Sequence, residues 1–442
     1  MSARRRLAVV AGAIALVALA ACSEPLPKES ATPTTTLPGS DGCADEASVL
    51  ACTPKGTMLD SFLPAKPTKA TGTPIKIGTI NQDTGAAGAF PELTAADRTA
   101  IDFINNELNG VDGHPIELVT CDTQFSPDLS QACAQQMVAE NVDAVVGGID
   151  VWGTGITTLE NNGIPYVGGI PVSLQAARSP VSFQFSGGIW GAVLGHGEYA
   201  LREHGAKRIA IIAADFGPIT DAAKLGQRVL EQRGVDTTLI SVAAINADMV
   251  QALNTAAQSD PDAIIALTAD SGCKPTMLTA QQLGLKVPIL YTGACAAPKI
   301  VDSVNGAADG AVFNLEADLD PGNPDNVLYQ LISARYGTKY GYERLSAGTV
   351  SFRAMMNLYA VLRTIGGDDV TRERVLEAFR SGRNHASFFG HPYTCDGHQL
   401  EGYPAMCSPQ QSLGRLNGGA VTAVTGWLDV GRFAESARRS GK

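Results

Sequence analysis

Apolar residues recur along most of the chain with two alternating periods, and these periods predict strands and helices in turn. The segment 74–80 has the composition of a buried strand, and a helical face follows it, formed by Leu93, Ala96, Ala100, Ile101, Ile104 and Leu108. The same alternation continues to Tyr291, with a restart after Gly187 and Gly188. We therefore predict an α/β protein with two doubly wound parallel sheets, each covered by helices on both faces.

The C-terminal third of the chain breaks this alternation. After a predicted strand over 311–315, three helical stretches lie between 323 and 381 without strands of their own. Such helices must cover a sheet that has already formed, so we expect the chain to cross between two lobes more than once and to form a multi-crossover hinge. The expected division is 74–186 plus 317–388 for lobe 1, 187–316 plus 389–433 for lobe 2, and a tail at 434–442.

The N-terminus has the pattern of an export signal. Three arginines, Arg4 to Arg6, precede an uncharged apolar stretch that ends in Leu19-Ala20-Ala21-Cys22, which resembles a bacterial lipobox. We expect residues 1–21 to be a lipoprotein signal peptide and Cys22 to carry the lipid, with an ordinary secretory cleavage as the alternative. Residues 22–73, rich in Pro, Thr and Ser, predict a flexible tether.

Net charge and hydropathy exclude two classes of partner. The 442 residues carry a formal charge of −11, and no basic block occurs beyond the first residues, so we expect no binding to nucleic acid. Beyond the N-terminus no apolar run reaches the ~18 residues of a membrane span. The expected location is the extracytoplasmic face of the cell membrane, reached through the lipid anchor only.

The cysteines fit an oxidising compartment. Besides Cys22 the chain has eight cysteines, an even number, and their proximity in sequence suggests the pairs Cys43–Cys52, Cys121–Cys133, Cys273–Cys295 and Cys395–Cys407. The last pair also has an alternative, because His391 and His398 could complete a zinc site with Cys395 and Cys407. We favour the disulfide and expect no metal.

Sequence motifs of catalysis and of cofactor binding are missing. The chain has no Gly-x-Ser-x-Gly, His-Glu-x-x-His or phosphate-loop motif, and the Gly-rich run 187–197 lacks the context of a dinucleotide fingerprint. We therefore expect no cofactor and no enzymatic activity.

The loops after the predicted strands carry the candidate ligand-binding residues. In open α/β sheets, ligands bind outside the carboxyl ends of the strands, so several such loops should meet in one cleft. We expect aromatic walls, hydroxyls for an anion or carbonyl, and acids for a cationic group. The candidates are Asp83, Thr84, Phe90, Asp150, Trp152 and Ser173 from the first lobe, and Phe216 and Asp270 from the second.

Several segments of the chain follow a pattern known from one protein family. They are Ile75–Gly78 with Thr84-Gly85, Ala100–Asn105, Gly113–Leu118, Val142–Gly147, Gly163–Pro165, Gly205–Ile212 and Pro261–Ile265. Together these segments resemble the type I solute-binding proteins of bacterial ABC importers, of the branched-chain amino-acid kind. The resemblance covers roughly 74–432. It implies two lobes that close on a small polar ligand, such as an amino acid or related metabolite, and a monomer that delivers this ligand to an ABC permease.

The sequence departs from this family at the expected ligand. Amino-acid binders of the family typically have a tyrosine where Phe216 stands, a second aromatic residue near Cys273, and an acid in the turn that here reads Thr292–Cys295. A buried ammonium without a counter-charge is costly. Either Asp150, Asp270 or Asp83 supplies that charge, or the ligand is a polar metabolite other than a simple α-amino acid. A ligand-sensing lipoprotein that feeds a signalling partner is the alternative function.

Overall fold

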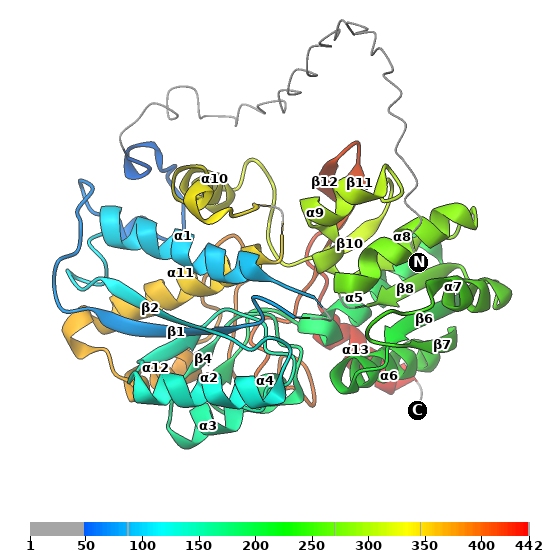
Figure 1. Cartoon of the computed structure of the whole chain (residues 1–442), viewed down its shortest axis with the longest axis horizontal. Helices are drawn as coiled ribbons and strands as arrows, with labels where there is room; N and C mark the ends of the chain where they lie inside the picture. Colours follow the sequence, from blue (N-terminus) through cyan, green and yellow to red (C-terminus); the bar gives the residue numbers. More distant parts are fainter. Residues whose placement is uncertain (1–47, 86–87, 269, 345, 441–442) are drawn as a thin grey trace, which may run out of the picture.

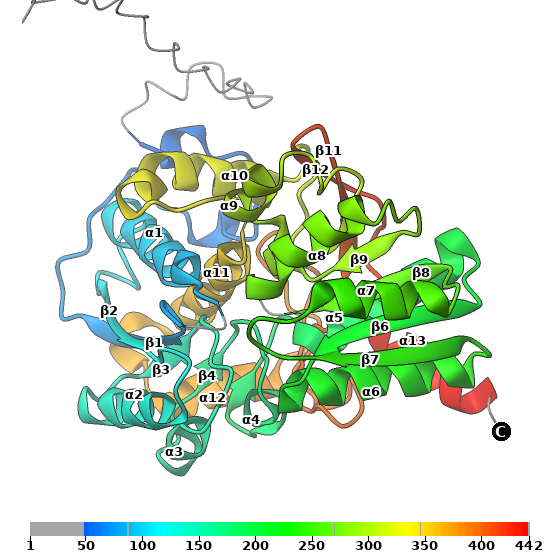
Figure 2. The same cartoon turned by 45° about the vertical axis from the view of Figure 1, so that its right-hand side comes forward.

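The computed structural model describes residues 48–85, 88–268, 270–344 and 346–440. These residues form two lobes that lie side by side, each built around its own sheet (Figure 1; Figure 2). This arrangement agrees with the two α/β lobes expected from the sequence.

Lobe 1 contains a five-stranded sheet in which every neighbouring pair of strands is parallel. The strand order is β2-β1-β3-β4-β5, so the order reverses between β1 and β3. Apart from the edge strand β2, its strands are largely buried, as expected for a sheet covered on both faces. They are β1 (Ile75–Asn81), β2 (Ile116–Asp122), β3 (Ala144–Val146), β4 (Tyr166–Val167) and β5 (Ser182–Phe183).

Helices cover both faces of this sheet. On one face α1 packs against α11, and a core rich in aromatic side chains, including Phe103, Phe352 and Tyr359, fills the space beneath them. On the other face lie α2 and α3, and α2 begins at Ser126, whose Oγ accepts a hydrogen bond from the Leu129 amide. The helices are α1 (Pro91–Glu107), α2 (Pro127–Ala139), α3 (Ile156–Asn161), α4 (Leu174–Arg178), α10 (Pro324–Ile332), α11 (Gly348–Ile365) and α12 (Arg372–Ser381), with a π-helical turn at Ser333–Gly337.

Lobe 2 repeats the same strand order and extends it by a hairpin. Its order is β12-β11-β10-β9-β8-β6-β7, in which β11 runs antiparallel to both of its neighbours and the other pairs are parallel. The order here reverses between β6 and β8. The strands are β6 (Arg208–Ala214), β7 (Asp236–Val242), β8 (Ala263–Leu267), β9 (Ile289–Tyr291), β10 (Val312–Leu315), β11 (Ser412–Asn417) and β12 (Ala420–Ala423).

The helices of lobe 2 also form two layers. One face of the sheet carries α5 (Gly188–His204), α6 (Gly217–Gln232) and α13 (Val430–Ser440), and the other carries α7 (Met249–Gln258) and α8 (Asp270–Gln282), with the short α9 (Pro298–Val301) nearby. Helix α13 includes most of the segment that the sequence suggests as a tail. Its Phe433 and Ala437 are buried in the core with α5 and α6, which explains why this segment is folded.

The segment 48–73, which the sequence assigns to the tether, lies folded on lobe 1. It contains 3₁₀ turns at Leu50–Cys52 and Asp60–Phe62. The Glu107 carboxylate accepts hydrogen bonds from the backbone amides of Val49 (3.0 Å) and Leu50 (2.8 Å), and Leu59 is fully buried. A few apolar side chains and one carboxylate therefore hold a Pro- and Thr-rich segment in place, and its composition alone does not reveal them.

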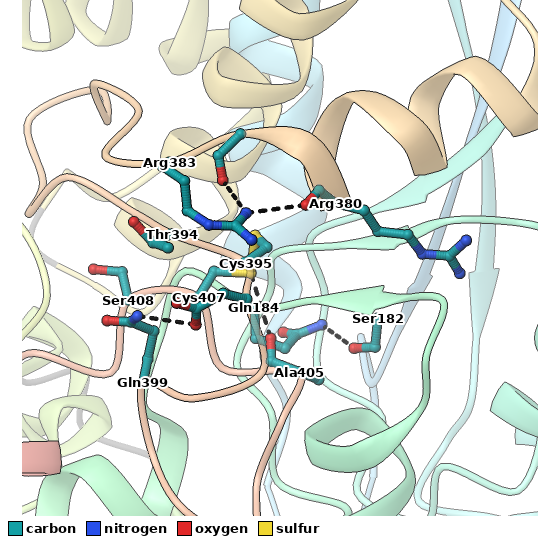
Figure 3. Close-up of a disulfide and its surroundings, with 12 residues drawn as sticks. Ser182, Gln184, Arg380, Arg383, Thr394, Cys395, Gln399, Ala405, Cys407 and Ser408 are labelled. Carbon is teal, nitrogen blue, oxygen red and sulfur yellow. Dashed lines mark hydrogen bonds between the residues drawn. A yellow bond between two sulfur atoms is a disulfide. The ribbon is translucent and has the colours of Figure 1, made fainter.

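Three chain crossovers join the lobes, at 184–187, 316–323 and 389–411, as expected for a multi-crossover hinge. The first and third run side by side: the Gln184 amide donates to the Ala405 carbonyl (2.8 Å), and the Cys407 amide donates to the Gln184 carbonyl (2.7 Å) (Figure 3). The disulfide Cys395–Cys407 closes the third crossover into a loop beside this contact.

Three of the four disulfides predicted from sequence are present in the structure. They are Cys121–Cys133, Cys273–Cys295 and Cys395–Cys407. Cys43, and with it the fourth pair, lies outside the described residues, as do the signal peptide and Cys22. Among the described residues, no helix is long and apolar enough to span a membrane.

Candidate functional site

A cavity of about 190 Å³ lies between the lobes, at the edge where both sheets end their parallel strands. This volume is more than ten times the ~10–15 Å³ that one water molecule requires. It is bordered by the turns that follow β1 and β3 in lobe 1 and β6 and β8 in lobe 2, which are the pairs of strands where each strand order reverses. Ligands of doubly wound sheets bind at such points.

Most of the side chains that line the cavity are apolar. Lobe 1 contributes Gln82, Phe90, Phe125, Ile149, Val151, Ile170, Val172, Leu319, Ala347, Thr349 and Val350. Lobe 2 contributes Gly188, Ile189, Ala192, Phe216, Ile219, Ala244, Thr268, Thr292, Gly293, Ala294, Ala296, Asn314, Leu315 and Val421, and Glu316, Ala317 and Ser346 complete the lining. This composition differs from the mixed polar lining that the sequence-derived candidates suggest.

The loop after β3 shows why the predicted residues and the lining residues differ. Ile149 and Val151 line the cavity, whereas Asp150 and Trp152, which alternate with them, do not. Asp150 instead bonds within lobe 1, and Trp152 packs against Phe125 and Phe216 at the border between the lobes. The loop that the sequence predicts therefore borders the cavity through Ile149 and Val151 rather than through Asp150 and Trp152.

Asp150 has a structural role in this loop. Its carboxylate is buried and accepts hydrogen bonds from Ser130 Oγ (2.6 Å) and from the Gly153 amide (3.1 Å). Burial raises the pKa of this carboxyl group, and the two hydrogen bonds oppose that effect. Ser173 is structural as well, because its Oγ caps α4 by accepting from the Ala176 amide (3.2 Å).

The two candidates after β1 lie near the cavity without lining it. Asp83 accepts hydrogen bonds from Asn81 Nδ2 and Thr94 Oγ1, both at 2.7 Å, and Thr84 is exposed and donates to Asp122 (2.6 Å). Burial raises the pKa of Asp83. Asp270 is the first residue of α8, and its side chain lies outside the described part of the structure.

Phe90 and Phe216 are the two candidates that line the cavity, one from each lobe. Asn81, the last residue of β1, positions two parts of the lining at once. Its Nδ2 donates to the Phe90 carbonyl (2.9 Å), and its Oδ1 accepts from the Ile149 amide (3.0 Å). A buried amide with these contacts holds the turns after β1 and β3 in fixed positions relative to each other.

Trp152 forms a contact between the lobes. Its indole packs against Phe125 of lobe 1 (ring centroids 5.6 Å apart) and against Phe216 of lobe 2 (5.2 Å), and its Nε1 donates to the Phe125 carbonyl (3.0 Å). Phe125 and Phe216 also line the cavity. The three rings, called the aromatic cluster below, therefore border one end of the cavity and connect the two lobes.

The hinge borders another part of the cavity through Glu316. Its Oε1 accepts from Gln411 Nε2 (2.8 Å), and its Oε2 lies 3.9 Å from Nη2 of Arg353, a fully buried residue of α11. Arg353 also donates to the backbone carbonyls of Glu316 and Phe185. One guanidinium thus holds the first two crossovers, and Gln411 attaches the third.

Glycine is required where α5 begins. Gly188 has a φ of +53°, and a Cβ there would lie 2.0 Å from the Pro171 carbonyl oxygen. Only glycine combines this left-handed conformation with so close an approach. The close contact brings the first turn of α5, with Ile189 and Ala192, against the cavity.

Several lining residues have no direct signal in the sequence. Phe125 has a φ of +58°, an uncommon conformation for an aromatic residue, and Gln82 directly precedes the candidate Asp83 without being a candidate itself. In the sequence, Ile170 and Val172 have the same apolar character as core residues. A cavity lined by apolar side chains has the same sequence pattern as a core, and only the meeting of two lobes distinguishes the two.

The alternative zinc site is not formed by the residues considered for it. Cys395 and Cys407 share a disulfide, so neither sulfur is a thiolate, and His391 Nδ1 lies 2.7 Å from the Pro392 carbonyl oxygen. No group of three or more His, Cys, Asp or Glu side chains within the described ranges is arranged to hold a metal ion.

Two lobes with repeated doubly wound sheets, three crossovers and a cavity between them define the class of two-lobed binding proteins. Within that class the chain belongs to the periplasmic binding protein family, whose model matches residues 74–406. No curated protein matches the chain by sequence.

Solved structures give the same fold at low sequence identity. The chain is similar to a leucine-binding protein of Thermotoga maritima (20% identity, TM-score 0.65, covering 79% of this chain and 98% of that one). It is also similar to the fatty acid ABC transporter substrate-binding protein of Thermomonospora curvata (17% identity, TM-score 0.68, covering 84% of this chain and 96% of that one). A third similar structure is the branched-chain amino acid transporter substrate-binding protein of Streptococcus pneumoniae in complex with isoleucine (16% identity, TM-score 0.66, covering 80% of this chain and 100% of that one). The fold is therefore that of the type I solute-binding proteins of ABC transporters.

Proposed function

We propose that this protein captures a small molecule between its lobes outside the cytoplasm and delivers it to an ABC importer. The observation that carries the proposal is the cavity, which both lobes line and which the aromatic cluster and the hinge border. The similar structures bear the names of ABC transporter binding proteins. The protein releases its ligand chemically unchanged and acts as a monomer.

The anchor is part of the same proposal. Cys22 carries the lipid after removal of residues 1–21, and the following residues connect it to lobe 1. The lipobox-like sequence Leu19–Cys22 supports this part of the proposal. A lipid-anchored binding protein remains beside its permease, so that a captured ligand need not diffuse far.

A matched pair of substitutions tests the proposal in cells. Val172→Asp places a carboxylate in the cavity lining, whereas Val250→Asp makes the same change at a residue of α7 that is 50% exposed. A metabolite screen by thermal shift first identifies a compound that stabilises the wild-type protein. Cells that produce only Val172→Asp should lose uptake of this compound, and cells with Val250→Asp should retain it.

The possible results separate the candidate functions. Normal uptake with Val172→Asp, although the purified variant no longer binds the compound, would contradict a role in import. Uptake that never depends on this protein, together with a ligand-dependent change in gene expression, would favour the signalling function. Conversion of the bound compound to a product would show an enzyme.

A further inference from the structure

We propose, building on the proposed function, that the ligand is an uncharged and largely hydrocarbon molecule with a hydrogen-bond donor, such as a hydroxyl group. The first argument is the composition of the walls. Isoleucine, valine and phenylalanine side chains surround the cavity from both lobes, including Ile149, Val172 and Ile189 as well as Phe90 and Phe216. Burial of hydrocarbon against such walls is favourable, and the gain grows with the apolar area removed from water.

The second argument is the charge of the lining. Glu316 is the one charged residue among the described lining residues, and its carboxylate already faces the guanidinium of Arg353 and the amide of Gln411. The charges of Glu316 and Arg353 cancel, so neither an ammonium nor a carboxylate of a ligand would find an unpaired opposite charge there. A charged group buried without a partner is strongly unfavourable.

The third argument is that three buried polar atoms of the lining make no hydrogen bond among the described residues; Glu316 Oε2 has its ion pair with Arg353, and the other two have no partner. Gln82 Nε2 donates to the Gly88 carbonyl (2.7 Å), which fixes the orientation of the amide and leaves Oε1 buried with no hydrogen bond within the described chain. Thr268 Oγ1, on the other lobe, is likewise buried and unpaired among the described residues. Buried polar groups in native proteins are nearly always paired.

These two atoms define the polar part of the ligand. Gln82 Oε1 only accepts, so the group that meets it must carry an O–H or N–H. The Thr268 hydroxyl either donates or accepts and so adds no requirement for charge. A neutral hydroxyl or amide satisfies Gln82, whereas an ammonium would bring a charge that the lining does not balance.

A displacement assay on the purified chain tests this proposal. The reporter is N-phenyl-1-naphthylamine, a neutral aromatic amine whose fluorescence rises in apolar surroundings. The competitors are 1-octanol, octanoate and octylammonium, which share one hydrocarbon chain and differ in the charge of the end group, together with leucine. We expect the reporter to bind and 1-octanol to displace it at a concentration at least about tenfold lower than any charged competitor.

The same pair of variants locates the effect. Val172→Asp adds a negative charge to the cavity. It should therefore weaken the binding of the reporter and of 1-octanol at least about tenfold and strengthen the binding of octylammonium relative to them. Val250→Asp, exposed on α7, should leave the order of the competitors unchanged. Far-UV circular dichroism of both variants checks that they fold.

Two other outcomes overturn the proposal in different ways. If leucine, octanoate or octylammonium binds the wild-type chain as tightly as 1-octanol, and Val172→Asp alters that binding, the ligand class is wrong and capture between the lobes stands. If no compound binds, or if Val172→Asp changes the binding of none of them, the ligand class and the proposed capture between the lobes both fail.

Discussion

The indole of Trp152 and the phenyl ring of Phe216 meet edge to face, with centroids 5.2 Å apart and with one ring on each lobe. Such pairs contribute about 0.5–1.5 kcal/mol beyond the burial of their area. The contact lies at the border of the cavity, because Phe216 lines the cavity and Trp152 packs against Phe125, which lines it as well. The aromatic cluster therefore favours the closed arrangement of the lobes that encloses a ligand.

Phe216→Ala should open the aromatic cluster and expose Trp152 to water. We expect the emission of Trp152 to shift to longer wavelength and the affinity for a cavity ligand to fall about two- to tenfold, the equivalent of one aromatic pair. The signal of Trp152 is obtained as the difference between each protein and its Trp152→Phe counterpart. Phe62→Ala is the control, because it removes a partly buried ring of lobe 1 that packs against Tyr359. It should leave the Trp152 signal unchanged.

The disulfide Cys273–Cys295 should affect binding as well as stability. It joins α8 to the turn after β9, and that turn contributes Thr292, Gly293 and Ala294 to the cavity. Replacement of both cysteines by serine should cost about 2–4 kcal/mol of unfolding free energy. It should also weaken binding of N-phenyl-1-naphthylamine, because the turn is then held less firmly.

Cys121–Cys133 provides the matched comparison for this prediction. It joins β2 to α2, and neither cysteine lines the cavity. Its double serine variant should lose a similar amount of stability in urea unfolding and keep the affinity of the wild-type chain for the fluorescent reporter. An equal loss of affinity in both variants would show that the Cys273–Cys295 disulfide has no particular role at the site.

Asp97 should make stability depend on pH. Its side chain is fully buried, with Oδ2 2.9 Å from Thr79 Oγ1 and Oδ1 unpaired among the described residues, and this burial raises the pKa of the carboxyl well above the ordinary 3.8. The folded state then binds a proton more tightly than the unfolded state. The resulting stabilisation is complete below the unfolded pKa and is lost as the pH rises through the folded pKa.

Asp97→Asn tests this assignment because the carboxamide stays neutral at every pH, and its oxygen can accept the hydrogen bond that Thr79 Oγ1 donates to Asp97. The melting temperature of the variant minus that of the wild type should increase as the pH is raised from about 4 to about 8. The same difference for the exposed Asp302→Asn should be nearly constant. A constant difference for Asp97→Asn as well would mean that Asp97 keeps an ordinary pKa in the folded protein.

Cys22→Ala should release the protein from the membrane. Two acyl chains on one residue give stable anchoring, whereas a chain without them has no other predicted attachment. In detergent phase separation, the wild-type protein should enter the detergent phase and the variant should remain in the aqueous phase or accumulate with its signal peptide. Ser23→Ala is the control, and partitioning of Cys22→Ala with the detergent would contradict the anchor.

The sequence was sufficient for the architecture and insufficient for the site. Strand and helix periods located the sheet of lobe 1 from β1 at Ile75–Asn81 onward, since burial on both faces leaves a clear apolar pattern. Asp150 was selected because a carboxylate after a strand is typical of binding sites, yet it bonds Ser130 and Gly153 within its own lobe. The neighbouring Ile149 and Val151 line the cavity, and no local pattern separates such residues from the core.

A crystal structure of the chain with the tightest-binding compound of the octyl series would test the central claim, capture between the lobes, most directly. The account predicts that the compound lies between Phe90 of lobe 1 and Phe216 of lobe 2, with its polar end at Gln82 Oε1 or Thr268 Oγ1. A compound bound on the outer surface of either lobe, with the space between Phe90 and Phe216 left free, would contradict it.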